Sequence, residues 1–366
     1  MKKLGFGMMR LPLIDESDPK SIDIEQSIKL VDTYIAAGYK YFDTAYIYNK
    51  GSSEKVIGTI LTDRYPREKF ILTDKMPCML IRSREDYDKI FQKQLERTHV
   101  EYFDYYFFHA LGKKYYKQIE ELDGFGWMKQ KLEEGKIKHI GFSYHDDAET
   151  LDIILSEHPE VELVQLQLSY ADWDNPSIQS HKNYEVCVKH NRKVSVMGPL
   201  KGGSLVNLPA DVETVLKKYE PDREIASWGL NFAAGLDNVF VVLSGMSTID
   251  QVESNIKIMD NASPLTEEEK KVLQDAVELL KSKNAIACTA CRYCVDGCPM
   301  SINIPSYFGL YNTQHVYGMG DNYIQTYMNI KGGKPSDCIG CGQCESICPQ
   351  HLPVIDNLKK VTDVFG

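Results

Sequence analysis

Short runs of apolar, β-branched and aromatic residues recur along the first two thirds of the chain, and segments with apolar residues at helical spacing separate them. Runs of this length and composition are typical of buried strands. Eight such runs are predicted to be strands: Lys3–Met9, Lys40–Thr44, Phe70–Lys75, Phe103–His109, Ile137–Ser143, Leu163–Leu168, Lys193–Gly198 and Val239–Ser244. The amphipathic segments predicted to be helices include Ile24–Ala37, Glu54–Leu61, Tyr87–Thr98, Trp127–Glu134 and Tyr184–His190.

This alternation of strand and helix, repeated eight times over about 260 residues, predicts an α/β fold of the (β/α)8 type, a TIM barrel. A doubly wound open sheet is the competing interpretation. It ranks lower because no Gly-x-Gly-x-x-Gly follows the first predicted strand. Gly38 and Gly135 each follow a predicted helix, and we expect both to end it in the left-handed conformation that glycine adopts readily.

The composition of the chain changes near Asn284. Just before, a last helix is predicted to begin with Thr266 as N-cap and Glu269 completing a capping box, and to run to about Lys283. Cysteine, glycine and proline dominate afterwards. We therefore predict two domains, a barrel over residues 1–284 and a small, mainly helical domain with a C-terminal tail over residues 285–366.

The bulk composition narrows the class of protein. The 366 residues are 43% hydrophobic and 26% charged, which is ordinary for a globular protein. A net charge of −10 argues against a nucleic-acid partner, because phosphate binding needs a basic surface. No apolar run approaches the roughly 20 residues of a membrane span, and Arg10 and Pro12 interrupt the N-terminal apolar stretch too early for a signal peptide. We expect a cytoplasmic protein.

Polar residues stand where three of the predicted strands end. Asp43, Lys75 and His109 close successive strand runs, and Tyr48 lies five residues after Asp43. A barrel gathers the carboxyl ends of its strands on one face, so these side chains could meet there. An ammonium lowers the pKa of a neighbouring phenol from its ordinary value of about 10, and such a phenol can protonate a carbonyl oxygen. Each residue taken alone is more often structural.

At this point the sequence resembles the aldo-keto reductases over roughly residues 1–260. Residues 43–48 read Asp-Thr-Ala-Tyr-Ile-Tyr and residues 51–54 read Gly-Ser-Ser-Glu, as the family's Asp-Thr-Ala-x-x-Tyr motif and its continuation do. The resemblance implies a catalytic tetrad of Asp43, Tyr48, Lys75 and His109. It also implies hydride transfer between a nicotinamide coenzyme, usually NADP(H), and a small carbonyl or alcohol substrate.

The resemblance implies coenzyme contacts at the ends of the fifth to eighth strands. They are Ser143, Gln165, Met197, Gly198, Leu200, Gly245, Ser247, Gln251 and Asn255. Ser143 and Gln165 would bind the nicotinamide amide, and Met197 replaces an aromatic residue that stacks on the ring. The resemblance also implies that Gly245, Ser247, Gln251 and Asn255 hold the adenosine phosphate. The family's Gly-x-Ser-Asn has Tyr144 in place of Asn, and no Lys or Arg stands in the loop from 245 to 248 to bind a 2′-phosphate. NAD(H) and a flavin therefore stay open as alternatives.

The ten cysteines fall into two isolated residues and two clusters. Cys78 and Cys187 are isolated, and we expect buried free thiols. The clusters are Cys288, Cys291, Cys294 and Cys298, and Cys338, Cys341, Cys344 and Cys348, each followed by proline. This spacing is typical of cubic [4Fe–4S] clusters. Zinc is the alternative, but its sites use two cysteine pairs with a longer loop between them.

The two cysteine motifs resemble the two-cluster bacterial ferredoxins, in which the fourth cysteine of each motif binds the other cluster. The resemblance implies one ligand set of Cys288, Cys291, Cys294 and Cys348, and a second of Cys338, Cys341, Cys344 and Cys298. The long insert between the motifs, Met300–Asp337, departs from that pattern, and we expect it to form helices.

Three functional readings follow. The first is a nicotinamide-dependent carbonyl reductase with Tyr48 as proton donor, in which the clusters transfer electrons or staple a domain too small for its own core. The second is an electron-transfer enzyme whose clusters feed a substrate or flavin in the barrel, with or without a redox partner protein. The third is a non-enzymatic protein that senses the coenzyme or binds a partner, and the intact tetrad argues against it.

Overall fold

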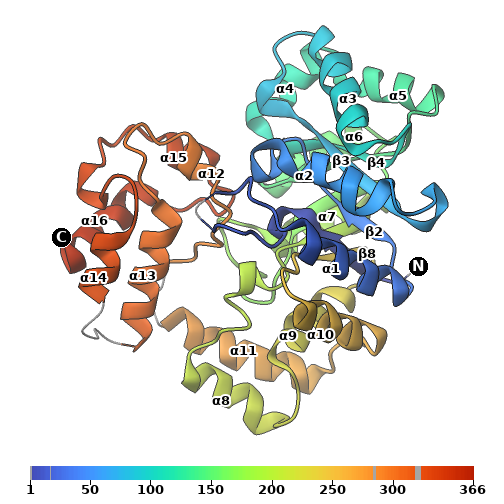
Figure 1. Ribbon diagram of the computed structural model, residues 1–366. Helices are drawn as coiled ribbons and strands as arrows, with labels where there is room; N and C mark the ends of the chain where they lie inside the picture. The colour runs from blue at the N-terminus through green and yellow to red at the C-terminus, as the bar shows by residue number, and fades with distance from the viewer. Residues whose placement is uncertain (1, 17, 283–285, 318–322) are drawn as a thin grey trace. The chain divides into compact units, whose positions relative to one another are not determined.

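The computed structural model describes residues 2–16, 18–282, 286–317 and 323–366. Its contacts divide the chain into two compact units (Figure 1). The first comprises Met1–Pro199 and Ala226–Leu265, and the second Leu200–Ile225 and Thr266–Gly366. The boundary predicted near Asn284 lies outside the described residues. Among those residues, no helix is long and apolar enough to cross a membrane.

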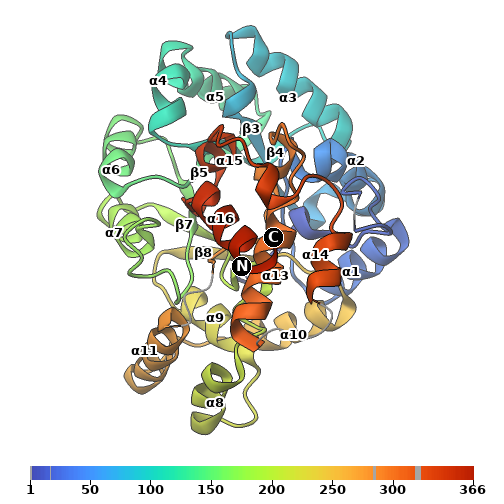
Figure 2. The same ribbon diagram turned by 90° about the vertical axis from the view of Figure 1, so that its left-hand side faces the viewer.

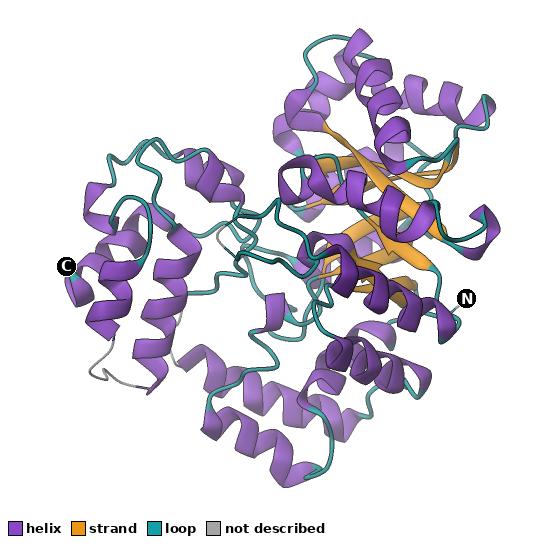
Figure 3. Cartoon of the chain, in the orientation of Figure 1, coloured by secondary structure: helices purple, strands orange, loops and turns teal. Residues whose placement is uncertain are grey.

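The first unit is built on a closed barrel of eight parallel strands, seen in orange in Figure 3. Each strand pairs with its neighbours in the sequence, and β1 closes the ring by pairing with β8. The strands are β1 (Leu4–Gly7), β2 (Tyr41–Asp43), β3 (Ile71–Pro77), β4 (Phe103–Leu111), β5 (Ile137–Tyr144), β6 (Leu163–Gln167), β7 (Lys193–Met197) and β8 (Val239–Ser244). All eight predicted strand runs are confirmed, and with them the (β/α)8 fold.

Helices connect the strands of this unit. They are α1 (Ile24–Ala36), α2 (Ser52–Ile57), α3 (Glu85–Thr98), α4 (Lys113–Glu121), α5 (Gly124–Glu133), α6 (Ala148–Glu157), α7 (Ser180–Lys189), α9 (Ile225–Ala234) and α10 (Ile249–Asp260). Local chemistry starts several of them, since the side chains of Asp23, Asp147 and Thr248 accept backbone N–H groups at the N-termini of α1, α6 and α10. Gly38 and Gly135 adopt φ values of +82° and +69°, as predicted.

Large side chains fill the inside of the barrel. A buried cluster there comprises Tyr41, Tyr105, Phe107, Leu163, Val241 and Leu243. Gly141 makes room for it, because a Cβ at this position would lie 2.3 Å from the Leu163 carbonyl oxygen and 2.4 Å from the Phe107 ring. Since the interior is packed, the space for chemistry lies at the carboxyl ends of the strands.

The second unit is helical, and it contains the C-terminal segment for which a mainly helical domain was predicted. Its helices are α8 (Ala210–Tyr219), α11 (Glu267–Ser282), α12 (Tyr293–Asp296), α13 (Ile304–Tyr317), α14 (Tyr323–Asn329), α15 (Gln343–Ile347) and α16 (Val354–Phe365). The predicted capping box opens α11: Thr266 N donates to Glu269 Oε2 at 2.6 Å, and Glu269 N donates to Thr266 Oγ1 at 3.2 Å.

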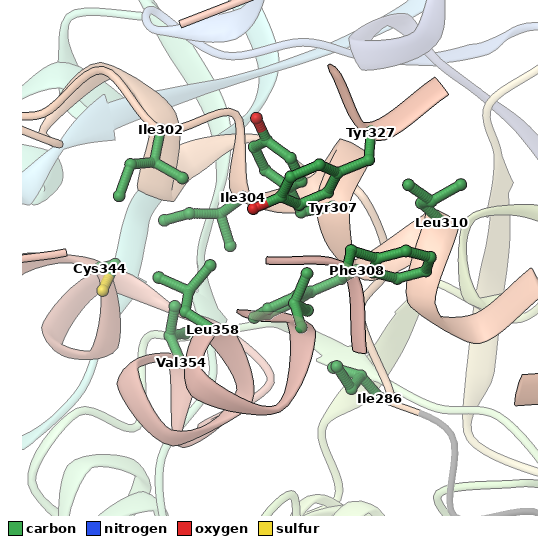
Figure 4. Close-up of a cluster of buried hydrophobic side chains, with 12 residues drawn as sticks. Ile286, Ile302, Ile304, Tyr307, Phe308, Leu310, Tyr327, Cys344, Val354 and Leu358 are labelled. Atoms are coloured by element: carbon green, nitrogen blue, oxygen red, sulfur yellow. The ribbon is translucent and has the colours of Figure 1, made fainter. Parts of the chain in front are cut away.

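The predicted helices of the insert are also present. They are α13 and α14, and α13 packs against both α14 and α16 (Figure 2). Their apolar faces form a core that includes Ile304, Tyr307, Phe308 and Leu358 (Figure 4). Cys344 belongs to the same core, so part of the cysteine motif is anchored in the packing of the unit.

Candidate active site

The side chains of Asp43, Tyr48 and Lys75 converge at the carboxyl ends of the barrel strands. Lys75 Nζ donates to Asp43 Oδ1 at 2.6 Å and to the Thr44 carbonyl oxygen at 2.7 Å. It also donates to the Tyr48 hydroxyl oxygen at 3.3 Å. All three ammonium hydrogens therefore have an acceptor, one of which is the phenol.

Strand register places these groups together. Asp43 is the last residue of β2 and pairs with Thr73, so its side chain points into the barrel beside that of Lys75, two residues further along β3. His109 on β4 pairs with Pro77 of β3. The sequence prediction relied on the position of these residues at the ends of the predicted strands, and the structure brings the four residues to one end of the barrel.

The ion pair between Lys75 and Asp43 is deeply buried, with side-chain exposures of 0% and 3%. Burying two charges costs several kcal/mol per ion unless further hydrogen bonds satisfy them. Here Gln165 Nε2 donates to the second oxygen, Asp43 Oδ2, at 3.0 Å. Gln165 lies on β6, so this bond spans the barrel from β2 and holds the carboxylate in place.

His109 lies against the edge of Tyr48, with ring centroids 5.7 Å apart and an interplanar angle of 84°. Burial, the charge of Lys75 and that of His145 hold the pKa of His109 well below its ordinary value. The imidazole is therefore neutral at neutral pH and can offer an N–H to an oxygen beside Tyr48. Its Nδ1 is buried and has no hydrogen-bond partner in the described part of the chain.

Ser143 is tied to the strand that holds His109. The register of β4 against β5 shifts between Phe108 and Leu111, and Ala110 adopts a left-handed φ of +57°. The Ala110 backbone N–H then donates to Ser143 Oγ at 2.8 Å. Ser143 and Gln165 are register partners on β5 and β6 and both are buried, so the two residues expected at the nicotinamide amide lie side by side.

Met197 and Gly198 stand at the end of β7. Met197 is half-buried and packs against the apolar cluster of the barrel interior. Gly198 has φ +66°, a conformation that a side chain would strain. Leu200, also predicted to contact the coenzyme, belongs to the second compact unit.

The four residues predicted to hold the adenosine phosphate are placed around the start of α10. Ser247 N donates to Gln251 Oε1 at 2.8 Å, and Asn255 Nδ2 donates to Ser244 Oγ at 2.9 Å. Asn255 is buried, although a polar residue on a helix such as α10 more often faces the solvent. Gln251 and Asn255 thus shape the loop that contains Gly245 and Ser247.

Arg10 is a neighbour of this loop that the sequence did not reveal. Its side-chain stem covers Gly245, where an added Cβ would lie 2.9 Å from both Arg10 Cβ and Arg10 Cδ. Ser247 Oγ donates to the Arg10 carbonyl oxygen at 2.7 Å. The signal that could have found it is barrel closure, which sets the segment after β1 beside the segment after β8.

Other aromatic residues near the strand ends have packing partners. The Tyr144 hydroxyl donates to the Asp147 carbonyl oxygen at 2.6 Å, so it turns to the start of α6 and does not replace the missing Asn. Trp173 stacks on His181 with centroids 4.5 Å apart. The Arg97 guanidinium lies 4.6 Å from the centre of the Tyr46 ring.

The second predicted cluster site is assembled in one cavity. Four of its lining residues are the cysteines expected to act together: Cys298, Cys338, Cys341 and Cys344. Apolar neighbours such as Pro299, Ile302 and Ile339 make up most of the remaining wall. Cys298 comes from the first motif and the other three from the second, so the chain crosses between motifs here.

The first predicted set is also drawn together. Burial, followed by the charges of Cys291, Cys288 and Cys348, raises the pKa of the Cys294 thiol well above its ordinary value. Burial likewise raises the pKa of Cys344 in the second set to about 11. The eight motif cysteines form no disulfides. Within the described ranges, no three His, Cys, Asp or Glu side chains converge as on a single metal ion. The thiols of both motifs gather in the second unit, which fits the donor chemistry of an iron–sulfur cluster, since such clusters are held by cysteine thiolates.

The isolated cysteines behave as predicted. Cys78 and Cys187 are fully buried free thiols, and burial raises the pKa of both. Neither lies near the cysteine motifs in the sequence.

Two family models match the chain. The model described as aldo/keto reductase family covers residues 3–278, and the one described as 4Fe-4S dicluster domain covers residues 287–352. The chain therefore belongs to the aldo/keto reductase family and is an oxidoreductase of that type with an iron–sulfur domain at its C-terminal end.

Individual proteins are also similar to this chain in sequence or in fold. The chain is 25% identical over 288 residues to the 9,11-endoperoxide prostaglandin H2 reductase of Trypanosoma cruzi, covering 76% of this chain and 88% of the relative. The holo form of an aldo-keto reductase from Bacillus halodurans matches 75% of this chain and 91% of its own, with TM-score 0.59 and 24% identity. An aldo-keto reductase from Klebsiella pneumoniae in complex with NADPH matches 75% and 90%, with TM-score 0.60 and 19% identity.

Proposed function

We propose that the chain reduces a small carbonyl substrate with NADPH, and in reverse oxidises the alcohol with NADP. The observation that supports this most is the buried Lys75 ammonium, which bridges Asp43 Oδ1 at 2.6 Å and the Tyr48 hydroxyl at 3.3 Å. Such an ammonium favours loss of the phenolic proton. When bound, the coenzyme supplies the hydride that adds to the carbonyl carbon.

The residues divide the remaining work. Tyr48 donates its hydroxyl proton to the substrate oxygen as negative charge develops there. Lys75 then stabilises the phenolate, and Asp43 keeps Lys75 charged and oriented. Neutral His109, whose ring faces Tyr48, donates a hydrogen bond to the same oxygen and fixes the substrate. Asp43, Tyr48, Lys75 and His109 are thus the proposed catalytic tetrad.

The proposed coenzyme site follows the rim from β5 to α10. Ser143 and Gln165 bind the nicotinamide amide, and Met197 stacks on the nicotinamide ring. Gly198 and Leu200, which follow Met197 in the sequence, are the remaining proposed contacts after β7. Gly245, Ser247, Gln251 and Asn255 form the adenosine-phosphate loop at the N-terminus of α10, where backbone N–H groups favour an anion. Arg10, whose stem covers Gly245, supplies the cation for the 2′-phosphate. The NADPH bound by the Klebsiella pneumoniae relative also favours this coenzyme.

We further propose two [4Fe–4S] clusters in a domain over residues 285–366, following a barrel domain over residues 1–284. The ligands of one are Cys288, Cys291, Cys294 and Cys348, and those of the other are Cys338, Cys341, Cys344 and Cys298. The shared cavity of the second set and the charge of Cys348 at Cys294 support these assignments.

The dicluster domain also favours a second candidate function for the chain. In this reading the clusters pass single electrons from a redox partner protein to a substrate or flavin in the barrel. The hydride mechanism is favoured because the tetrad provides a proton donor and its supporting cation.

Changing Tyr48→Phe tests the proposed chemistry. The ring and its packing are retained but the proton is lost, so we expect turnover with NADPH and small aldehydes to fall at least about a hundredfold. NADPH binding, followed by fluorescence titration, should be unchanged. Turnover equal to that of the unaltered protein would contradict the role of Tyr48.

A further inference from the structure

Two buried carboxyl groups lie behind the proposed site. Asp74 precedes Lys75 on β3, and the alternation of side chains along a strand sends it to the outer face of the barrel wall. Glu54 belongs to α2. Both residues are 0% exposed, and neither takes part in the proposed mechanism.

Glu54 is held from two sides by residues of α3. Its Oε1 accepts from Gln94 Nε2 at 2.9 Å, and its Oε2 accepts from Arg97 Nη1 at 2.7 Å. The Tyr106 hydroxyl in turn donates to Gln94 Oε1, which fixes the amide in this orientation. The carboxylate end of Glu54 is therefore rigidly placed.

The same network forms hydrogen bonds to both the backbone N–H and the backbone carbonyl oxygen of Lys75. The Lys75 N–H donates to Asp74 Oδ1 at 2.7 Å. Gln94 Nε2 donates to the Lys75 carbonyl oxygen at 3.1 Å, in addition to its bond with Glu54. The peptide groups on either side of the proposed catalytic lysine are thus bonded to buried side chains.

Charge balance decides the protonation state of this network. Arg97 forms an ion pair with Glu54 and balances one negative charge. A second ionised carboxyl group beside Glu54 would have no cation of this network to balance it. Asp74 Oδ2 is buried and has no hydrogen-bond partner in the described part of the chain. The Asp74 and Glu54 carboxyl groups each act on the pKa of the other, so they lie close together. A bond between two carboxyl groups requires a proton on one of them.

The surrounding charges agree with a proton on Asp74. Burial, then the charges of Glu54 and Asp43, hold the pKa of Asp74 well above its ordinary value, although the Lys75 N–H and ammonium act the other way. Burial raises the pKa of Glu54 as well, against the lowering effect of Arg97 and Gln94. Burial also raises the pKa of the neighbouring Tyr106 well above its ordinary value, so this phenol stays neutral.

We propose that Asp74 is protonated at neutral pH and donates a hydrogen bond to Glu54, and that this carboxyl pair positions Lys75. The role assigned to the pair rests on the function proposed for Lys75. The pair bears one negative charge, which Arg97 balances. Asp43 of β2 is then the carboxylate that binds the Lys75 ammonium, and it does so inside the barrel, on the other side of β3 from Asp74.

Two substitutions of Asp74 test whether its hydrogen bonds, and not a negative charge, position Lys75. Asp74→Asn keeps the shape, an acceptor for the Lys75 N–H and a donor for Glu54, so kcat should stay within about twofold. Asp74→Ala removes both bonds, so kcat should fall about ten- to a hundredfold with KM and NADPH affinity unchanged, because Lys75 is displaced.

Asp104→Ala is the matched control. Asp104 Oδ2 accepts the backbone N–H of Leu72 at 2.9 Å, so this variant removes the same kind of bond from the other end of β3. It also removes the ion pairs of Asp104 with Arg67 and Lys138, which makes it a demanding control for damage to the strand. We expect it to lower stability but to leave kcat within about twofold. A loss of kcat as large as in Asp74→Ala would show general strand damage and overturn the positioning role.

Infrared difference spectroscopy tests the proton without any turnover. The C=O stretch of a protonated carboxyl group should be present at neutral pH in the unaltered protein and in Asp104→Ala, and absent in Asp74→Asn. A missing band in the unaltered protein, or an unchanged band in Asp74→Asn, would overturn the shared proton. If the band behaves as expected but the unaltered protein reduces no carbonyl, the proposed function fails instead.

Discussion

His109 is a neutral histidine beside the Lys75 ammonium, and protonation of its imidazole would destabilise the folded protein. Its pKa is depressed in the fold by burial, Lys75 and His145, whereas the unfolded chain titrates at the ordinary value of about 6.5. Below that pH the unfolded state therefore binds a proton that the folded state does not. The free energy of unfolding must fall as the pH decreases through this value.

We expect this loss to disappear in His109→Gln. Between about pH 7.5 and pH 5.5 the unaltered protein should lose up to about 1.4 kcal/mol per pH unit more than the variant, measured by urea unfolding of the barrel. Glutamine retains an N–H donor but has no proton to bind. Parallel pH profiles for the two proteins would show that His109 is charged in the folded state.

Arg10 makes a separate prediction about the coenzyme. Changing Arg10→Met keeps an unbranched stem over Gly245 but removes the positive charge. We expect the Kd for NADPH to rise about tenfold or more, as for a lost charged hydrogen bond, and the Kd for NADH to stay unchanged. Equal weakening of both coenzymes would place Arg10 at the pyrophosphate, and no weakening would exclude it from the site.

Local residue patterns predicted which side chains meet at the strand ends, but they did not predict the hydrogen bonds that cross the barrel. The pairing of Asp43 and Lys75 could be predicted from the sequence, because they stand at the ends of two successive predicted strands, and their side chains form an ion pair. The bond from Gln165 to Asp43 joins residues 122 positions apart, on opposite sides of the ring. It depends on closure of the barrel, as does the approach of Arg10 to Ser247.

Among the structural elements, β4 shows where a pattern stops being informative. Its apolar run predicted a strand to His109, and the strand continues to Leu111 after a shift of register. Ala110 adopts φ +57° there, a conformation uncommon for residues other than glycine, so nothing in its side chain announced it. The bond from its N–H to Ser143 Oγ provides a local reason for the shift.

Gly141 on β5 gives a prediction at the scale of an element. Gly141→Ala would place a Cβ 2.3 Å from the Leu163 carbonyl oxygen, so β5 and β6 would have to move apart. We expect the free energy of unfolding to fall by about 1–3 kcal/mol, measured by urea denaturation. Gly135→Ala is the control, since no atom lies within 4 Å of the added Cβ and its φ of +69° alone should cost about 1 kcal/mol. A larger loss in Gly135→Ala would contradict the clash.

At the scale of the whole molecule, the two units differ in how far the sequence predicts them. The barrel follows from eight repeats of one local pattern, each of which could be recognised by itself. The second unit has no such repeat, and its core is assembled from α13, α14 and α16 on either side of the second cysteine motif. Its cysteine spacing, the capping box of α11 and the presence of helices in the insert could be predicted, because each depends on neighbouring residues alone. The packing of those helices on one another could not.

The crossed ligand sets make the last prediction. If Cys298 shares a cluster with Cys338, Cys341 and Cys344, as their common cavity suggests, Cys298→Ala should damage the same cluster as Cys341→Ala. Electron paramagnetic resonance of the reduced variants should then give matching spectra for these two, distinct from that of Cys291→Ala. Cys78→Ala is the control, because this isolated buried thiol should leave both clusters intact.

The competing arrangement assigns each cluster to one motif. It requires Cys298→Ala to match Cys291→Ala, because both residues belong to the first motif. The two arrangements therefore differ in the variant whose spectrum matches that of Cys298→Ala: Cys341→Ala if the ligand sets cross, and Cys291→Ala if they do not. Cys348→Ala repeats the test from the other side: its thiolate charge acts on Cys294, so its spectrum should match that of Cys291→Ala. A match with Cys341→Ala instead would show that the chain does not cross between the motifs.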